Sequence, residues 1–392
     1  MKPLFWDIET SIRNGTPNPF TKSNFIVSAA WAVGDEEPKF TYYKDPDFLA
    51  ELLGLLSEHE SVGVNLKFDL NWIKRHNSTM HQCLSVWDCQ IAEHIMSGQK
   101  SIMPSMDKLC ERYGIKGKEG GLEEYWKAGI STEDIPIDIV REYNKDDIRR
   151  TRAIYYAQQR DPRLSITERI KGLIYADGED LQCLSDMEYN GIKYDMLESR
   201  RLDSTLRLEL NELKEWFYEL AKTKEINLSS GDHLSALLFG GSVEFTDTEV
   251  IHEVYKSGSR KGEARVYNKT VARRRFDYPG FFNPLPGSEL KKSLKEGAPK
   301  VYSTSDVVLK QLKSRSKIQK TLLEKLSRYA FLEKVTSTYL TALPNLVDKM
   351  EWEGYLHGSF NQTIAATGRL TSSAPNLQNT APLADQMLIT RF

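Results

Sequence analysis

The stretch Phe5-Trp6-Asp7-Ile8-Glu9-Thr10 is a short apolar run that ends in two carboxylates two residues apart. Side chains alternate between the two faces of a β-strand, so Asp7 and Glu9 are expected to share one face. Two acids on one face repel each other and lose hydration when they are half buried. A divalent cation that prefers oxygen ligands, such as Mg²⁺, relieves this repulsion. Taken alone, an Asp-x-Glu pair is more typical of a strand end that reaches solvent. Support for a cation site must therefore come from other residues of the chain.

Size and composition describe an ordinary globular protein. The 392 residues are 40% hydrophobic and 28% charged, with a net charge of -2. This length allows two or three domains, and the charge balance means that any DNA-binding surface is a local patch. The four cysteines have no C-x-x-C spacing, which argues against a zinc site or a disulfide framework and fits a reducing cytosol. We expect no signal peptide, because the N-terminus turns acidic at Asp7, and no run reaches the ~18 apolar residues of a membrane span.

The first third of the chain places strands first and then alternates strands with helices. This order predicts an α/β fold with a mixed sheet and helices packed on it. Strands are predicted at residues 3–8, 25–33, 39–43, 61–65 and 86–88. Helices are predicted at residues 47–57, 68–76, 88–96 and 137–155.

A second acidic candidate, Asp69, stands in Asn65-Leu66-Lys67-Phe68-Asp69-Leu70. It follows a predicted strand and begins a helix, which is where open α/β sheets build their sites. The helix dipole alone also favours an acid at this position. The sequence leaves both interpretations open.

The third candidate element is Tyr143-Asn144-Lys145-Asp146-Asp147. Tyr143 and Asp147 are four residues apart and therefore share a helix face, where a phenol and a carboxylate could hold a water and a metal together. The alternative is a solvated helix whose acids pair with neighbouring arginines. Asp146 fits that alternative better than Asp147 does. The arginines concerned are Arg149, Arg150 and Arg152.

In this order the candidates resemble the three motifs of the proofreading 3′-5′ exonuclease domain, of the DEDD type with a tyrosine in the third motif. The resemblance implies a ribonuclease H-like fold and two-metal hydrolysis with Mg²⁺, which Mn²⁺ can replace. It implies that Asp7, Glu9 and Asp147 hold the ion that activates water, with Asp7 bridging. It further implies that Asp69 helps to hold the second ion, largely through water, and that Tyr143 orients the attacking water.

The same resemblance sets expectations for residues 1–160 as an exonuclease domain. A single-stranded 3′ end is expected to enter unpaired, with its bases stacked on apolar or aromatic groups. Asp88, which follows a predicted strand, looks like the family's helix-capping Asp and is expected to be structural.

Residues 161–360 are expected to form a mostly α-helical thumb region. Long helices are predicted at 165–189, 197–223 and 319–343, and an insertion occupies about 245–300. Within 251–300, twelve basic residues face five acidic ones, and aromatic residues are interleaved. This mixture suits phosphate contact with base stacking. A solvated insertion fits the same composition, so both interpretations stay open.

The run Thr367-Gly368-Arg369-Leu370-Thr371-Ser372-Ser373-Ala374-Pro375-Asn376-Leu377-Gln378-Asn379 closely resembles the signature that opens the palm of family A DNA polymerases. Residues 187–192 and 357–363 also match that family, so 361–392 are expected to be the first palm segment. The resemblance implies contacts with the minor groove of primer-template DNA. Minor-groove acceptors are present on every base pair, so such contacts check shape rather than sequence. The residues concerned are Arg369, Asn376, Gln378 and Asn379.

After Asn379 the sequence departs from the family at Thr380-Ala381-Pro382, and it stops at Phe392 without fingers or the catalytic palm aspartates. We therefore expect a DNA proofreading exonuclease that polymerises only with a second polypeptide carrying palm and fingers, either as half of a split polymerase or as a truncated product. One alternative is a DNA-binding or assembly subunit, and another is an RNA-trimming exonuclease. The family suggests a bacterial or phage-infected cytosol.

Overall fold

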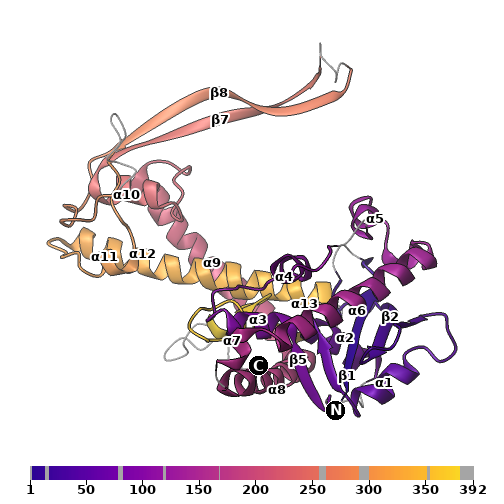
Figure 1. The fold of residues 1–392 in the computed structure, drawn as a ribbon. Coiled ribbons are helices and arrows are strands. Elements are labelled where there is room, and N and C mark those ends of the chain that lie inside the picture. Colours follow the sequence, from indigo (N-terminus) through magenta and orange to yellow (C-terminus); the bar gives the residue numbers. More distant parts are fainter. Residues whose placement is uncertain are drawn as a thin grey trace. The chain divides into compact units, whose positions relative to one another are not determined.

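The computed structural model describes residues 2–13, 17–77, 83–117, 121–166, 168–255, 262–290, 300–350 and 354–379 (Figure 1). The chain divides into two compact units. Unit 1 comprises Met1–Leu197 with Ala342–Phe392, and unit 2 comprises Glu198–Thr341. The domain boundaries expected after residues 160 and 360 stay predictions.

A five-stranded mixed sheet forms the centre of unit 1, with the strand order β3-β2-β1-β4-β5. The central strand β1 pairs antiparallel with β2 and parallel with β4, and β4 pairs parallel with β5. The predicted mixed sheet with packed helices is therefore confirmed. The strands are β1 (Pro3–Thr10), β2 (Ile26–Val33), β3 (Lys39–Tyr42), β4 (Glu60–Gly63) and β5 (Ser85–Asp88).

Eight helices in the described part of unit 1 precede residue 191. Helix α6 packs against β1 and β2, and α8 packs against β5 and α2. The helices are α1 (Ala50–Leu56), α2 (Leu66–His76), α3 (Cys89–Met96), α4 (Met106–Tyr113), α5 (Glu123–Lys127), α6 (Ile137–Gln159), α7 (Pro162–Ser165) and α8 (Glu168–Asn190).

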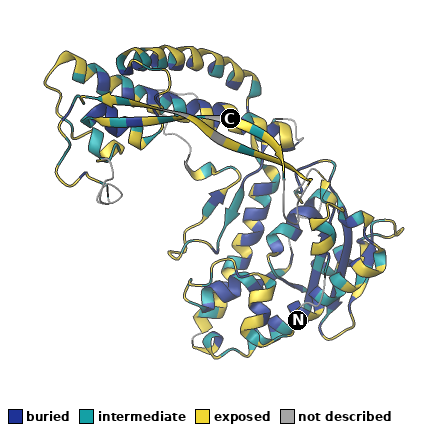
Figure 2. Ribbon diagram, turned by 90° about the horizontal axis from the view of Figure 1, so that it is seen from above, coloured by how far each residue is buried: buried dark blue, intermediate teal, exposed yellow. Residues whose placement is uncertain are grey.

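The alternation along β1 decides which side of the sheet carries the acids. Leu4, Trp6 and Ile8 are buried in one core together with residues of α1 and α2. Phe5 is buried in a second core with residues of α3 and α6. Because alternate residues share a face, Asp7 lies on the face of Phe5, toward α6. Most of the sheet is buried (Figure 2).

The last part of unit 1 is built from short strands. Strand β6 (Ile192–Lys193) pairs with β9 (Tyr355–Leu356), and β10 (Ser359–Asn361) pairs with β11 (Thr371–Ser373). A 3₁₀ turn, η5 (Leu377–Asn379), follows. The first pairing joins the chain after α8 to residues 355–356, and the second closes residues 359–373 into a hairpin.

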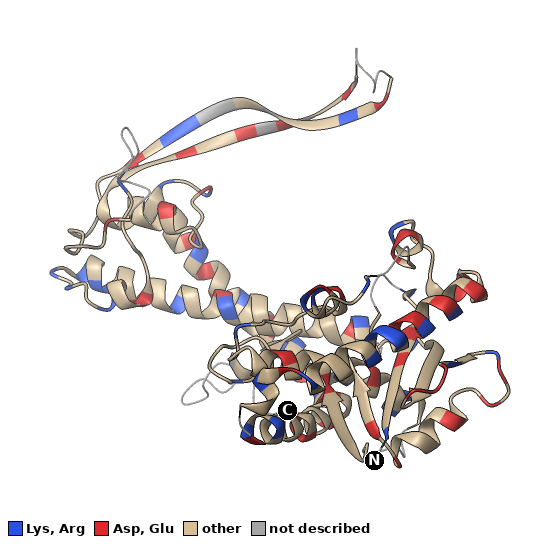
Figure 3. Cartoon of the chain, in the orientation of Figure 1, with Lys and Arg blue, Asp and Glu red and all other residues tan. Residues whose placement is uncertain are grey.

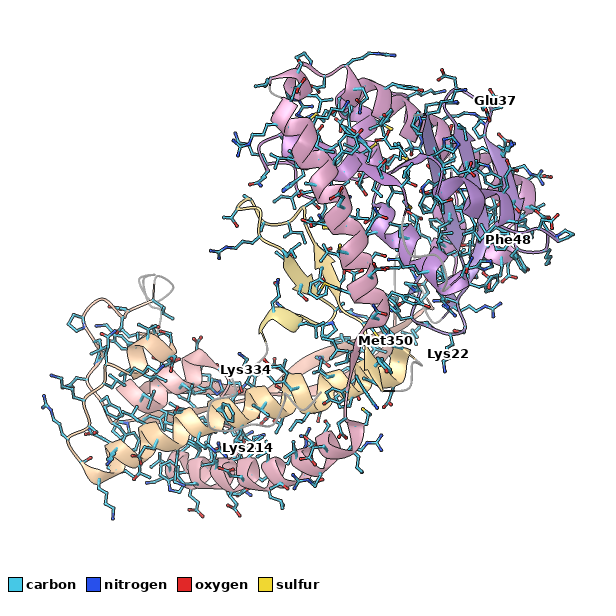
Figure 4. All side chains as sticks on the ribbon, turned by 90° about the horizontal axis from the view of Figure 1, so that it is seen from below. Lys22, Glu37, Phe48, Lys214, Lys334 and Met350 are labelled. Atoms are coloured by element: carbon cyan, nitrogen blue, oxygen red, sulfur yellow. The ribbon has the colours of Figure 1, made fainter. Side chains whose placement is uncertain are left out.

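In unit 2, two long helices, α9 (Met196–Ala221) and α12 (Lys317–Lys334), are both amphipathic. Six residues at three- or four-residue steps along α12 and the segment that follows it are buried: Leu322, Leu326, Tyr329, Leu332, Val335 and Tyr339. Arg328 on α12 forms a two-pronged ion pair with Glu209 on α9, at 2.6 and 2.7 Å. Figure 4 labels Lys214 and Lys334 on the two helices. Among the described residues, no helix has the length and apolar character needed to cross a bilayer.

The predicted helix 319–343 does not end before Pro344. Helix α12 passes into a π-helical segment, Val335–Ala342, and then into α13 (Leu343–Met350), which contains Pro344. A proline removes one backbone donor from a helix, and wider turns accommodate such interruptions. Hydroxyl groups satisfy carbonyl oxygens here: Thr336 donates to Leu332 at 2.8 Å, and Thr341 donates to Thr336 at 2.8 Å.

The insertion of unit 2 contains a long antiparallel hairpin that the sequence did not predict. Its strands are β7 (Gly241–Val254) and β8 (Ala264–Tyr278), and they are largely exposed (Figure 2). A short helix, α10 (Gly231–Phe239), packs at its base, and α11 (Asp306–Leu309) follows the insertion.

The charges of this hairpin are balanced across its strands. Four acids on β7 and Asp277 match the five basic residues of β8. In register, Glu244 lies opposite Arg275 and Glu253 lies opposite Arg265. Both signs of charge therefore run along the described hairpin, and the phosphate-contact interpretation is weakened (Figure 3). Six basic residues of 251–300 lie outside the described residues: Lys256, Arg260, Lys261, Lys291, Lys292 and Lys295.

Candidate active site

Three carboxylates from distant parts of the chain meet where α6 packs against the central strand of the sheet. Asp7 and Glu9 come from β1, and Asp147 comes from α6. One carboxylate oxygen of each lies within 4.8 Å of those of the other two. Glu9 and Asp147 are buried, and Asp7 is half-buried. The geometry therefore gathers three negative charges into one oxygen-lined site.

Asp69 lies in the first turn of α2 and is 4% exposed. It is not a member of the three-carboxylate cluster, but it lies within its electrostatic reach. Burial raises the pKa of the Asp69 carboxyl well above its ordinary value, and the charges of Asp7, Glu9 and Asp88 raise it further. Without a cation, ionising this group beside the others is costly.

The Tyr143 hydroxyl lies next to the same cluster. Burial raises its pKa, and the charges of Glu9 and Asp147 add to this effect. The hydroxyl donates a hydrogen bond to Glu123 of α5 at 3.3 Å, and the ring packs edge-on against Trp126 at 6.1 Å. The phenol therefore stays protonated at neutral pH and can both donate and accept a hydrogen bond.

The arginine pairing that the sequence suggested for this helix involves both acids. Arg150, which is 5% exposed, donates to Asp147 and also pairs with Asp146 at 3.2 Å and Asp107 at 3.4 Å. The two interpretations of Asp147 are therefore compatible, because a carboxylate has two oxygens and several acceptor positions.

Asn144 contacts the site although the sequence motifs did not indicate it. Its side-chain amide donates to a carboxylate oxygen of Asp7 at 2.8 Å, and its own oxygen accepts from Ser28 at 3.2 Å. Asn144 lies three residues before Asp147, so helical spacing alone places it on the face of α6 that meets β1. That spacing was the available signal.

Asp88 caps a helix, as predicted. Its side chain accepts from the backbone N–H groups of Gln90 at 2.7 Å and Ile91 at 3.1 Å, at the start of α3. It also accepts from the N–H of Leu66 at 2.8 Å, at the start of α2. Asp88 thus fixes the first turn of the helix that carries Asp69.

The residues of the site suit hard divalent cations. Asp7, Glu9 and Asp147 offer only oxygen donors, which Mg²⁺ and Mn²⁺ prefer. Their mutual repulsion supplies a driving force for cation binding. The arrangement could hold one ion among these three and a second on the side of Asp69.

This chain is similar to DNA polymerases. The sequence model described as DNA polymerase family A matches residues 282–388. DNA polymerase I of Synechocystis sp. is 25% identical over 394 residues, which cover 96% of this chain and 33% of that protein. Residues 282–388 of this chain thus match DNA polymerase family A.

Further DNA polymerases are similar to this chain. The thermostable DNA polymerase I of Thermus aquaticus is 30% identical over 50% of this chain and 17% of that protein. A solved structure, the POL domain of Pol1 from M. smegmatis in complex with DNA primer-template and dNTP, has a similar fold. Its TM-score is 0.63 at 18% identity, and the match covers 97% of this chain and 52% of that one. The chain thus spans about a third of the Synechocystis relative's length.

Two of the runs that resemble family A polymerases contact each other. Gly191 adopts a φ of +63°, and a Cβ on it would lie 2.8 Å from the ring of His357. Glycine is therefore required there for conformation and for space. His357 stacks on Phe20, with ring centroids 4.0 Å apart.

The candidate DNA-contacting residues lie on the stretch that follows β10. Arg369, Asn376 and Gln378 are exposed, and Asn379 ends η5. Ser372 holds the turn between them, since its hydroxyl accepts from the N–H of Leu377 at 3.0 Å. The structure therefore brings three of the four side chains to the surface of unit 1. The divergence at Thr380-Ala381-Pro382 lies outside the described residues.

Proposed function

We propose that this chain is a metal-dependent 3′-5′ exonuclease that removes nucleotides from DNA and proofreads in DNA replication. The observation that supports this most strongly is the convergence of Asp7, Glu9 and Asp147 within 4.8 Å. The proximity of Asp69 and Tyr143 adds to that support.

Mg²⁺ is the expected cofactor, and the donor set fits it. Asp7, Glu9 and Asp147 would hold one ion, and Asp69 would help to hold a second. When bound, two such ions activate a water and stabilise the leaving 3′ oxygen. Mn²⁺ has the same preference for oxygen ligands and would substitute.

The chain's own residues would orient the reactants. Asn144 keeps the carboxylate of Asp7 in place through its 2.8 Å hydrogen bond. Tyr143 stays protonated because its pKa is raised, so its O–H remains available to orient the attacking water. A water held in the reactive orientation reacts faster, because less entropy is lost on reaching the transition state.

The proposal takes DNA as the partner. The surface position of Arg369, Asn376 and Gln378 supports contact with primer-template duplex, and the unpaired 3′ end would enter the exonuclease site. Such an activity belongs in a bacterial or phage-infected cytosol. RNA is the competing substrate, and a single-stranded RNA of the same sequence separates the two.

The test is hydrolysis of a 5′-labelled single-stranded oligonucleotide in Mg²⁺. Wild type is expected to shorten it from the 3′ end, and Asp7→Ala with Glu9→Ala is expected to abolish the reaction without unfolding the chain. The matched control is Glu36→Ala with Glu37→Ala, which removes two exposed acids from a loop. If the first double variant degrades DNA at the wild-type rate, the proposal is wrong.

A further inference from the structure

Glu188 is a buried carboxylate on α8 that the exonuclease chemistry does not use. It is 3% exposed and accepts three hydrogen bonds. The donors are Lys67 Nζ at 2.6 Å, Asn71 Nδ2 at 2.8 Å and the backbone N–H of Phe360 at 2.6 Å. A buried charge with this many donors is fixed in one orientation.

The two side chains that reach Glu188 belong to the helix that carries Asp69. Lys67 and Asn71 are four residues apart and share one face of α2, and Lys74 continues that face. Asp69 is two residues from each, so it projects about 200° away from Lys67, on the opposite side. Helix α2 therefore has one polar face toward α8 and another toward the acidic cluster.

Further contacts join helix α2 to helix α8. The Ser185 hydroxyl donates to Asn71 Oδ1 at 2.7 Å, and Lys74 pairs with Asp186 at 2.5 Å. Ser185 and Asn71 are buried. These bonds act from the far side of the helix on the position of Asp69.

Glu188 also forms hydrogen bonds with His357 and Phe360, in the part of the chain that matches the polymerase family. The N–H of Phe360 on β10 donates to its carboxylate, and Lys67 donates to the carbonyl oxygen of Phe360. His357 Nδ1 lies 2.8 Å from the carbonyl oxygen of Glu188 and donates to it. Both residues lie within the matched range 282–388. One carboxylate thus joins α2, α8 and β10.

We propose that Glu188 is a positioning residue for Asp69, and that it fastens the segment 357–361 to the helix of the exonuclease site. This inference rests on the proposed function. Removing the carboxylate leaves the Asn71 amide and the Phe360 N–H without this acceptor, and the Lys67 ammonium keeps only the carbonyl oxygen of Phe360. Helix α2 then relaxes away from α8, and Asp69 moves relative to Asp7 and Glu9.

The variants are Glu188→Gln and Glu188→Ala, with Glu179→Gln as the matched control. Glu179 is exposed on the same helix, so the control repeats the change in charge at the surface. Glutamine keeps an oxygen acceptor and loses the ion pair. We expect kcat on single-stranded DNA to fall about tenfold for Glu188→Gln and about a hundredfold for Glu188→Ala, because small displacements of reacting groups have effects of this size. KM is expected to stay unchanged, and the half-saturating Mn²⁺ concentration to rise.

A binding measurement separates positioning from a general loss of stability. Mn²⁺ binding, followed by electron paramagnetic resonance, is compared in wild type, Glu188→Gln, Asp69→Ala and the double variant. We expect Glu188→Gln to weaken one of the two ions and to add nothing once Asp69 is absent. Asn71→Ala, which removes a donor to the other carboxylate oxygen, is expected to act in the same direction if the Glu188 variants fold poorly.

These measurements distinguish a failure of the Glu188 positioning role from a failure of the proposed exonuclease function. If folded Glu188→Gln binds both ions and cleaves DNA as wild type does, the positioning role is wrong while the exonuclease stands. The positioning role is also wrong if Glu188→Gln weakens Mn²⁺ binding equally in the presence and in the absence of the Asp69 carboxylate. If wild type neither binds Mn²⁺ nor cleaves DNA, the proposed function fails, and the inference fails with it.

Discussion

The Asn144 side-chain amide donates a 2.8 Å hydrogen bond to the carboxylate of Asp7, so α6 fixes the orientation of an acid on β1. We expect Asn144→Ala to lower the exonuclease kcat by about 10- to 100-fold, because Asp7 loses its fixed orientation. Since Asn144 is fully buried, the free energy of unfolding should also fall by about 1–3 kcal/mol. Ser28→Ala is the control, because it removes a hydrogen bond of Asn144 that does not involve Asp7. Equal losses of kcat in both variants would contradict this role.

Arg150 and Asp147 form a buried ion pair, with side chains 6% and 9% exposed. Arg150→Met should destabilise the metal-free protein by about 3 kcal/mol, because a buried carboxylate loses its partner. Mg²⁺ should restore part of this loss, since the ion then neutralises Asp147. Urea unfolding with EDTA and with Mg²⁺ measures both effects. Arg149→Met, at an exposed position, should change stability little with or without the metal.

The raised pKa of Asp69 predicts how stability depends on pH when no metal is bound. Between the unfolded pKa of about 4 and the raised folded pKa, the folded state binds more protons than the unfolded state. Stability therefore falls as pH rises through this window. Asp69→Asn should be more stable than wild type at pH 7 in EDTA, and the difference should disappear near pH 4. Melting temperatures of wild type and Asp69→Asn, measured in EDTA at several pH values, test this. A constant difference between the two melting temperatures at all pH values would refute it.

The charges of the hairpin predict a weak role in DNA binding. Arg274 pairs with Asp247 at 2.7 Å and also contacts Glu225. Arg369 is exposed and forms no ion pair with any described residue. Duplex affinity should therefore stay within about twofold in Arg274→Ala and fall about tenfold in Arg369→Ala. A fluorescence-anisotropy titration that shows the larger loss for Arg274→Ala would reverse this assignment.

The sequence predicted the local features of unit 1 because they depend on short-range patterns. The shared face of Asp7 and Glu9 follows from strand alternation, and the shared face of Tyr143 and Asp147 follows from helical spacing. The meeting of β1 with α6 is a tertiary fact, and only the resemblance to exonuclease motifs pointed to it. The contact between Glu188 and Lys67 spans 121 residues and leaves no local signal.

The strongly basic character predicted for residues 251–300 has a specific cause. The acids Glu244, Asp247 and Glu249 precede residue 251 and therefore lie outside that segment. The strand that supplies these acids pairs with the basic strand and neutralises it. The extension of the last helix through Pro344 was missed because the π-helical turn that accommodates it has no sequence rule of comparable strength.

The central claim is that carboxylates from β1, α2 and α6 hold two cations that cut DNA from its 3′ end. Anomalous diffraction at the manganese edge, from crystals grown with Mn²⁺, tests it most directly. We predict two peaks about 3.5–4 Å apart, one bound by Asp7, Glu9 and Asp147 and the other on the side of Asp69. The absence of any peak within coordination distance of Asp7 would contradict the account.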